Sequence, residues 1–265
     1  MKISKKSKSI IIKSFLFASL ILLWEVYAIR LNNPLMFPTF NETIKGFFTV
    51  IQNGELVSRI LSSLKVQVMG YVIGGFLALI LTIFAISTRF GAYLLELLTA
   101  VFNPLPPIAL LPLALLPLAL LWFGLGYGSI VFVIVHAVLW PIAINIYSGF
   151  QGVSNTLKMV SKNYELSTFE YIFKIAIPAA FPSILTGLKV GWAFSWRTLI
   201  ASELVFGVSS GNGGIGWFIY EKKNQLDINL VFAGLLTIIL IGIITDVIFE
   251  YIEKRTVVKW GMKTK

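Results

Sequence analysis

Six long apolar stretches set the limits on what this chain can fold into. They lie near residues 10–29, 66–86, 92–121, 128–148, 180–205 and 228–250. About 20 helical residues cross a hydrocarbon core that is ~30 Å thick, and a helix satisfies its own backbone hydrogen bonds inside lipid. Composition agrees, because 57% of the 265 residues are hydrophobic and only 13% are charged. The sequence therefore predicts an all-α polytopic membrane protein with about six transmembrane helices.

The distribution of lysine and arginine predicts the orientation of the chain in the membrane. With the N-terminus in the cytoplasm, fourteen Lys and Arg residues fall in cytoplasmic segments. Six fall on the opposite side, namely Arg30, Lys45, Arg59, Lys65, Lys222 and Lys223. The positive-inside rule therefore places both termini in the cytoplasm. We interpret the net charge of +10 as this orientation signal, and we expect membrane lipid and no nucleic acid as a partner.

Residues that several kinds of chemistry require are missing from the sequence. There are no cysteines, His136 is the single histidine, and no G-x-x-x-x-G-K-[ST] phosphate loop occurs. A chain without that loop cannot hydrolyse ATP by P-loop chemistry. We therefore expect no enzyme activity, no metal site and no cofactor. We interpret His136 as a neutral side chain packed against a neighbouring helix.

The third apolar stretch is unusual for a membrane span because of its prolines. Each proline removes a backbone donor and clashes with the preceding turn. We expect this span to be bent or broken and to face protein or a water-filled path, with a simple packing kink as the alternative. The prolines are Pro104, Pro106, Pro107, Pro112 and Pro117.

Two other spans carry residues that predict close packing or function. Gly70 and Gly74 in the second span form a small-xxx-small step that lets another helix approach closely. In the fifth span, Lys189 lies near enough to the cytoplasmic surface to snorkel, whereas Arg197 is deeper and Glu203 is near the outer end. An arginine facing a cavity suits an oxyanion, and an interhelical ion pair or a contact with a binding protein is the alternative. Our candidates for a translocation path are Pro107, Pro112, His136, Trp196, Arg197 and Glu203.

A polar segment at residues 158–183, KMVSKNYELSTFEYIFKIAIPAAFPS, interrupts the apolar sequence. Ser154 predicts the N-cap of a short helix that reaches Tyr164, and Ser167 with Glu170 forms a capping-box pattern. The apolar residues that follow recur on one helical face, and Pro178 is expected to end or bend this second helix. The segment therefore predicts two short helices, the second amphipathic, at the membrane surface.

Four stretches, in this order, resemble the permease subunits of ABC importers, and more narrowly the nitrate, sulfonate and taurine branch. They are NPLPPIALLPLALLPLALLWFGLG, IAIPAAFPSILTGLKVG, ASELVFG and GNGGIGWFIYEKKNQLDINLVFAGLL. The resemblance covers about residues 55–255 and implies the MetI-like permease architecture. It implies a single permease domain over 1–265, with residues 1–54 as first span and outer segment, 55–255 as core and 256–265 as cytoplasmic tail.

The resemblance also implies partners and a coupling element. The chain would form the path for a small solute, such as a sulfonate, taurine or nitrate, in a bacterial or archaeal cell membrane. Two cytoplasmic ATPase subunits, an extracytoplasmic substrate-binding protein and a second permease would complete the transporter, the second permease being another copy in a homodimer or a related permease. The cytoplasmic loop would dock on the ATPase through Met159, Val160 and Tyr164, with a polar rim at Lys162 and Glu165. The coupling candidates are Met159, Val160, Ser161, Lys162, Tyr164, Glu165, Ser167 and Pro178.

The loop departs from the pattern of the family in its first half. There the Glu-Ala-Ala positions of the motif fall on Met159, Val160 and Ser161, and its glycine falls on Glu165. A glutamate at a turn where glycine takes positive φ must either stay helical or accept strain.

Three rival functions remain open at this point. Broken spans and buried charges also occur in an ion-coupled secondary transporter, although no inverted halves are visible in the sequence. A membrane-embedded enzyme would need clustered His, Asp, Glu or Ser side chains, and a channel component would conduct without any ATPase.

Overall fold

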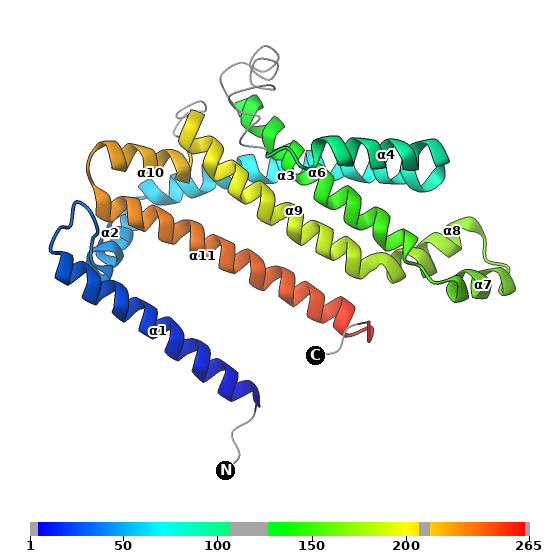
Figure 1. Ribbon diagram of the computed structural model, residues 1–265, viewed down its shortest axis with the longest axis horizontal. Helices are drawn as coiled ribbons and strands as arrows, with labels where there is room; N and C mark the ends of the chain where they lie inside the picture. The colour runs from blue at the N-terminus through cyan, green and yellow to red at the C-terminus, as the bar shows by residue number, and fades with distance from the viewer. Residues whose placement is uncertain (1–4, 107–126, 207–212, 263–265) are drawn as a thin grey trace.

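The computed structural model describes residues 5–106, 127–206 and 213–262, and every regular element in these ranges is a helix (Figure 1). The predicted all-α fold is therefore confirmed. The elements are α1 (Lys5–Leu31), α2 (Phe40–Gln52), α3 (Glu55–Ser87), α4 (Arg89–Phe102), α6 (Tyr127–Gln151), α7 (Asn155–Asn163), α8 (Thr168–Tyr171), the π-helix η1 (Ile172–Ala176), α9 (Ile177–Phe206), α10 (Ile215–Asn224), α11 (Ile228–Glu253) and the π-helix η2 (Lys254–Val258).

Five helical stretches among the described residues are long and apolar enough to cross a membrane. They are Ile11–Leu31, Glu55–Ser87, Tyr127–Gln151, Thr168–Val205 and Ile228–Val258. Each contains most or all of one predicted apolar stretch. The remaining prediction, residues 92–121, begins in α4, but Pro107, Pro112 and Pro117 lie outside the described residues. The chain is thus a multi-pass helical membrane protein.

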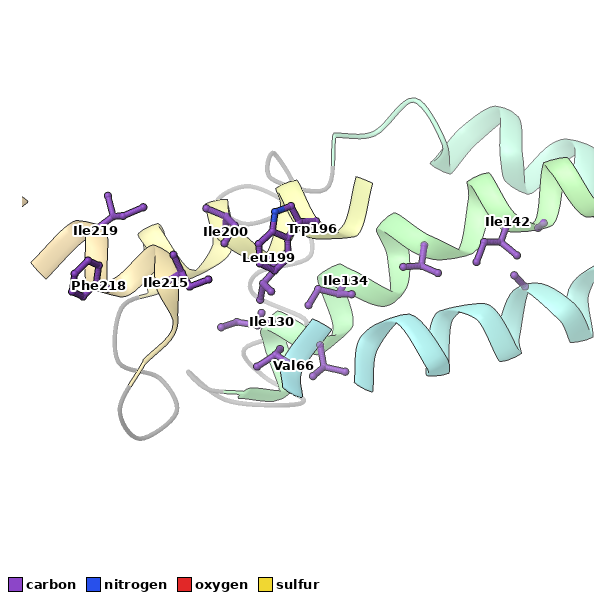
Figure 2. Packing of buried hydrophobic residues seen from close by; sticks show 14 of the residues in the cluster. Val66, Ile130, Ile134, Ile142, Trp196, Leu199, Ile200, Ile215, Phe218 and Ile219 are labelled. Carbon is purple, nitrogen blue, oxygen red and sulfur yellow. The ribbon is translucent and has the colours of Figure 1, made fainter. Parts of the chain in front are cut away.

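The centre of the fold is α6, which packs between α3 and α9. Figure 2 shows Ile130, Ile134 and Ile142 along α6, with Val66 on the α3 side and Trp196 and Leu199 on the α9 side. Lipid tails are as apolar as the side chains, so there is no hydrophobic driving force for helices to associate inside the membrane. Close van der Waals contact between the helices must hold them together instead. Small residues allow this contact on both sides of α6.

Glycines on α3 and α9 bring these helices against α6. A Cβ at Gly70 would lie 2.5 Å from Cγ2 of Ile134, and one at Gly74 would lie 2.9 Å from the carbonyl oxygen of Val135. On the other side, a Cβ at Gly191 would lie 2.9 Å from Cγ1 of Ile142. The close packing predicted for Gly70 and Gly74 is therefore confirmed.

The two ends of the long helices carry different short elements (Figure 1). The N-terminus, the C-terminus, α7 and α8 lie toward one end, while α2 and α10 lie at the other. The outer helices α1 and α11 are sparsely covered, because only 6% and 17% of the residues in their most apolar windows are buried. Their apolar surfaces are therefore available to lipid or to another chain.

Neighbouring glycines on α3 provide a matched test of the central packing. We expect Gly74→Ala to destabilise the protein by about 1–3 kcal/mol, because its Cβ would meet Val135 and Val138 on α6 at 2.9 Å. Gly75→Ala is the control, because its Cβ would have its nearest neighbour, Cδ1 of Ile142, at 3.8 Å. Both changes give the same gain in helix propensity. Thermal unfolding in detergent measures the difference, and equal unfolding temperatures for the two variants would contradict the packing account.

Candidate functional site

The short helix α7 has the ends that the sequence predicts. Ser154 is its N-cap, with the side-chain oxygen accepting from the backbone N–H of Leu157 at 3.3 Å. At its other end, the N–H of Leu166 donates to the carbonyl of Ser161 and that of Glu165 to the carbonyl of Lys162, both at 3.0 Å. This pair of bonds is the Schellman motif that closes many helices. The helix is therefore a defined element with a cap at each end.

Glu165 occupies the position in that motif where glycine is usual. Its φ is +50°, in the left-handed region. Of the two outcomes that the sequence allowed, helical continuation or strain, the structure has the second. A left-handed conformation costs a residue with a Cβ roughly 1–2 kcal/mol. The loop nevertheless turns at the place where the motif of the family has its glycine.

The surface of α7 is more apolar than its polar sequence suggests. Met159 is 60% exposed and Tyr164 is 77% exposed, while Val160 is 38% exposed. Ser161 is buried and donates to the carbonyl of Lys158 at 2.8 Å, so it faces the molecule. Lys162 and Glu165 are exposed beside the apolar residues. The five side chains named as anchors and rim thus lie on the outer surface.

The second helix of the loop differs from the prediction. Its capping box is present, because Ser167 accepts from the N–H of Glu170 and the Glu170 carboxylate accepts from the N–H of Ser167 at 3.1 Å. It is not a separate short helix, however, because α8 continues through η1 into α9. Pro178 lies in the first turn of α9, where the missing N–H falls just after the π-turn. Of the two outcomes expected at Pro178, an end or a bend, the structure excludes the end, and the loop is joined to α9 by unbroken helix.

The four candidate path residues that the structure describes do not meet at one place, and Pro107 and Pro112 lie outside the described residues. His136 packs against Trp140 with ring centroids 5.9 Å apart, and both line a cavity of about 160 Å³ together with Pro104, Pro106 and Phe194. Neither ring nitrogen of His136 has a hydrogen-bond partner within the described ranges. Trp196 and Arg197 instead line a groove between α9 and α11.

Glu203 lies at a third place, in a buried junction of α3, α9 and α10. It is only 3% exposed, and its carboxylate accepts from the Ser63 hydroxyl at 2.7 Å and from the Gly216 N–H at 2.8 Å. The same Ser63 hydroxyl oxygen accepts from the N–H of Ile215 at 2.9 Å. A Cβ at Gly214 would lie 2.0 Å from the Glu203 carboxylate. The first turn of α10 is therefore fixed by a carboxylate from α9 and a hydroxyl from α3.

The comparison with known families decides which kind of membrane protein this is. Residues 70–258 match the family described as the binding-protein-dependent transport system inner membrane component. The chain belongs to this family. The match covers α6, the loop with α7 and α8, and α9 to α11, so the resemblance noted in the sequence is confirmed.

Named relatives of this permease family agree over most of the chain. An ABC transporter permease protein of Methanocaldococcus jannaschii is 32% identical over 253 residues, covering 94% of this chain and 92% of the relative. The aliphatic sulfonates transport permease protein SsuC of Bacillus subtilis is 30% identical, covering 92% and 85%. The nitrate import permease protein NrtB of a Synechocystis strain is 30% identical, covering 75% and 69%.

The polar seam between α3 and α9 is the part of this permease that sequence reasoning missed. The side-chain amide of Gln67 donates to the Ser195 hydroxyl at 2.6 Å, and the Tyr71 hydroxyl donates to the carbonyl of Leu188 at 2.8 Å. Both contacts follow the Ser63–Glu203 contact along α3. One turn closer to the start of α3, Arg59 pairs with Glu221 of α10 at 2.7 Å. Residues 59, 63, 67 and 71 recur every four positions on α3. This period was the available signal, but Arg59 and Ser63 lie before residue 66, where the apolar run that we took as the span begins.

Because Glu203 and Ser63 hold the first turn of α10, we expect the local stability of α10 to depend on Glu203. Glu203→Ala would leave the Ser63 hydroxyl and the Gly216 N–H buried without their acceptor, and each such loss costs about 1–3 kcal/mol. We therefore expect faster backbone hydrogen exchange over residues 215–224 in this variant. Glu203→Gln, which keeps an acceptor, should show a smaller change, and Glu96→Ala at an exposed site of α4 is the control. Unchanged exchange in α10 of Glu203→Ala would show that the junction does not hold this helix.

Proposed function

We propose that the chain is the membrane-spanning permease subunit of an ABC importer. It forms the path for a small solute, of the sulfonate, taurine or nitrate kind, that a substrate-binding protein delivers and that separate ATPase subunits drive. Its family and the names of its relatives support this proposal. The observation that carries it is the exposed apolar surface of α7 in a chain whose sequence has no phosphate loop.

Helix α7 has the features of a docking element for an ATPase subunit. A stable contact needs apolar or aromatic anchors that become buried, surrounded by a polar rim. Met159, Val160 and Tyr164 supply the anchors, and Lys162 and Glu165 supply the rim. Met159 and Tyr164 are more than half exposed in the part of the chain that the structure describes. A partner surface with a matching groove would bury them.

The connections of α7 give it a route to the spans. On its N-terminal side, Val153 is buried directly after α6, and Ser154 caps α7. On its other side, unbroken helix runs from Thr168 into α9. Since α6 and α9 also pack against each other, a force on α7 acts on both members of the central helix pair. Ser167 caps the start of this continuous helix and Pro178 lies within it.

The remaining parts of the proposal concern sidedness and assembly. We place α7 and both termini in the cytoplasm of a bacterial or archaeal cell, with α2 and α10 outside facing the binding protein. One copy supplies half of a path, so two copies with two ATPase subunits form the transporter. The sparsely covered surfaces of α1 and α11 leave room for lipid and for the second copy. The chain itself is not an enzyme in this proposal.

Charge substitutions in α7 test the coupling role. We expect Met159→Asp combined with Tyr164→Asp to lower ATP-driven uptake by tenfold or more, because burying anchors contributes about 2 kcal/mol or more each. Membrane insertion should be unchanged, since both side chains are exposed. Asn155→Asp adds a charge to the same helix without removing an anchor and is the control. Normal uptake and normal copurification of the ATPase with the double variant would remove the basis for docking at α7.

A further inference from the structure

The residues that follow α11 form an ordered helical end to the last span. The π-helix η2 continues α11 directly. The N–H of Met262 donates to the carbonyl of Val257 at 3.1 Å, and Gly261 has a φ of +73°, the left-handed value that closes a Schellman motif. Residues 254–262, which we call the brace segment, therefore have a defined conformation with a capped end.

Two side chains of the brace segment attach it to the rest of the molecule. Val257 is 2% exposed, although it follows a span whose surface is otherwise open. Trp260 lies against Phe181 of α9, with ring centroids 5.3 Å apart and 62° between the ring planes. Rings in such an arrangement attract each other through the positive edge of one and the negative face of the other. The brace segment is therefore joined to α9 by residues that are distant in the sequence.

Phe181 lies at the point where the helix from the α7 loop enters the bundle. It is in the second turn of α9, beside the end of the brace segment (Figure 1). Another face of the same turns packs on α6, because a Cβ at Gly149 would lie 2.7 Å from Cβ of Ser183 and 3.1 Å from the carbonyl oxygen of Ala180. The start of α9 therefore contacts α6 through one face and the brace segment through another.

Farther along the two helices, α9 and α11 pack loosely against each other. A groove of about 240 Å³ runs between them, with Trp196 and Ile239 in its walls. A Cβ at Gly242 of α11 would have no atom within 4 Å among the described residues. Lys189 and Asp246 form an ion pair across the groove, but their side chains are 47% and 68% exposed, and exposed pairs stabilise a contact weakly. The brace segment therefore supplies a packed attachment that the rest of this interface lacks.

We propose that the brace segment makes α11 move together with the start of α9, with Trp260 and Phe181 as positioning residues for coupling. The inference rests on the proposed function, in which work enters at α7 and reaches α9 through unbroken helix. A displacement of the start of α9 then reaches α11 through the ring contact. Without this contact, α11 would be drawn mainly through α10, at the opposite end of the bundle. The brace segment thus extends the coupling route from α6 and α9 to the last span.

The alternative role for Trp260 is that of an interfacial anchor. Its side chain is 49% exposed, and tryptophan is enriched where a span meets the membrane surface. An anchor of this kind gains its stability from lipid and does not depend on Phe181. The two roles therefore give different results when Phe181 is changed.

Hydrogen exchange of the full-length permease in phosphatidylcholine nanodiscs tests the contact without its partners. Phe181→Ala should speed backbone exchange over residues 254–262 about two- to tenfold, because the attraction of the ring pair is lost. Phe173→Ala is the matched control, because it removes the same kind of side chain from a site that is 64% exposed. Unchanged exchange in the brace segment of Phe181→Ala would overturn the proposal and leave Trp260 as a lipid anchor.

Uptake and ATP hydrolysis by the assembled transporter test the positioning role. Trp260→Ala should raise the amount of ATP hydrolysed per solute imported by about twofold or more, because α7 still docks while α11 no longer follows α9. Trp260→Phe keeps a ring for Phe181 and should restore most of the ratio. Met262→Ala, on the same segment and 45% exposed, is the control. If Trp260→Ala does not insert, Phe181→Leu, which keeps an apolar side chain without the ring, takes its place.

The ratio separates positioning from simple stabilisation. If uptake and hydrolysis fall together at an unchanged ratio, or if neither changes, Trp260 does not position α11 and the proposal is overturned. Absence of ATP-driven uptake in the unmodified transporter would instead refute the proposed function, and the exchange result would stand because it uses no ATPase. An unresponsive brace segment would leave docking at α7 intact.

Discussion

The close contact of α6 with α3 and α9 is the interaction on which the rest of the structure depends. Gly70 and Gly74 on one side and Gly191 on the other leave no space for a Cβ against α6. Since lipid offers helices no hydrophobic reason to associate, this contact distance is what holds the bundle together. It also sets the positions of both ends of α6 and α9. The short helices α7 and α10 follow α6 and α9 in the chain, so their positions depend on this pair of helices.

The two ends of the bundle are built with different chemistry. At one end, Glu203 and Ser63 fix α10 through buried hydrogen bonds, and Arg59 pairs with Glu221. At the other end, Met159 and Tyr164 of the α7 region are exposed, and α7 is stabilised mainly by the hydrogen bonds that cap its two ends. A buried hydrogen-bonded end resists separation of its helices, whereas an exposed apolar end favours a partner. This difference agrees with the proposed function, in which the permease would receive work at one end and substrate at the other.

The sequence predicted local features better than contacts between helices. Apolar runs located the spans, capping residues located α7, and the glycine spacing located the close packing, because each signal depends on neighbouring residues. The sequence could not decide between an end and a bend at Pro178, because a π-turn before it allows the helix to continue and no sequence signal marked that turn. Ser63 was missed because its role exists only when α3, α9 and α10 meet. The groove at Arg197 could not be predicted, since the sequence gives no sign of which face α11 covers.

In the proposed function, ATP hydrolysis by separate subunits drives transport through this permease. Solute uptake by cells that contain the permease with its partner subunits, with labelled methanesulfonate, taurine or nitrate, measures this directly. We expect uptake of the transported solute to survive collapse of the proton gradient and to stop when ATP is depleted. Uptake that stops with the proton gradient while ATP remains high would contradict it and would support an ion-coupled secondary transporter.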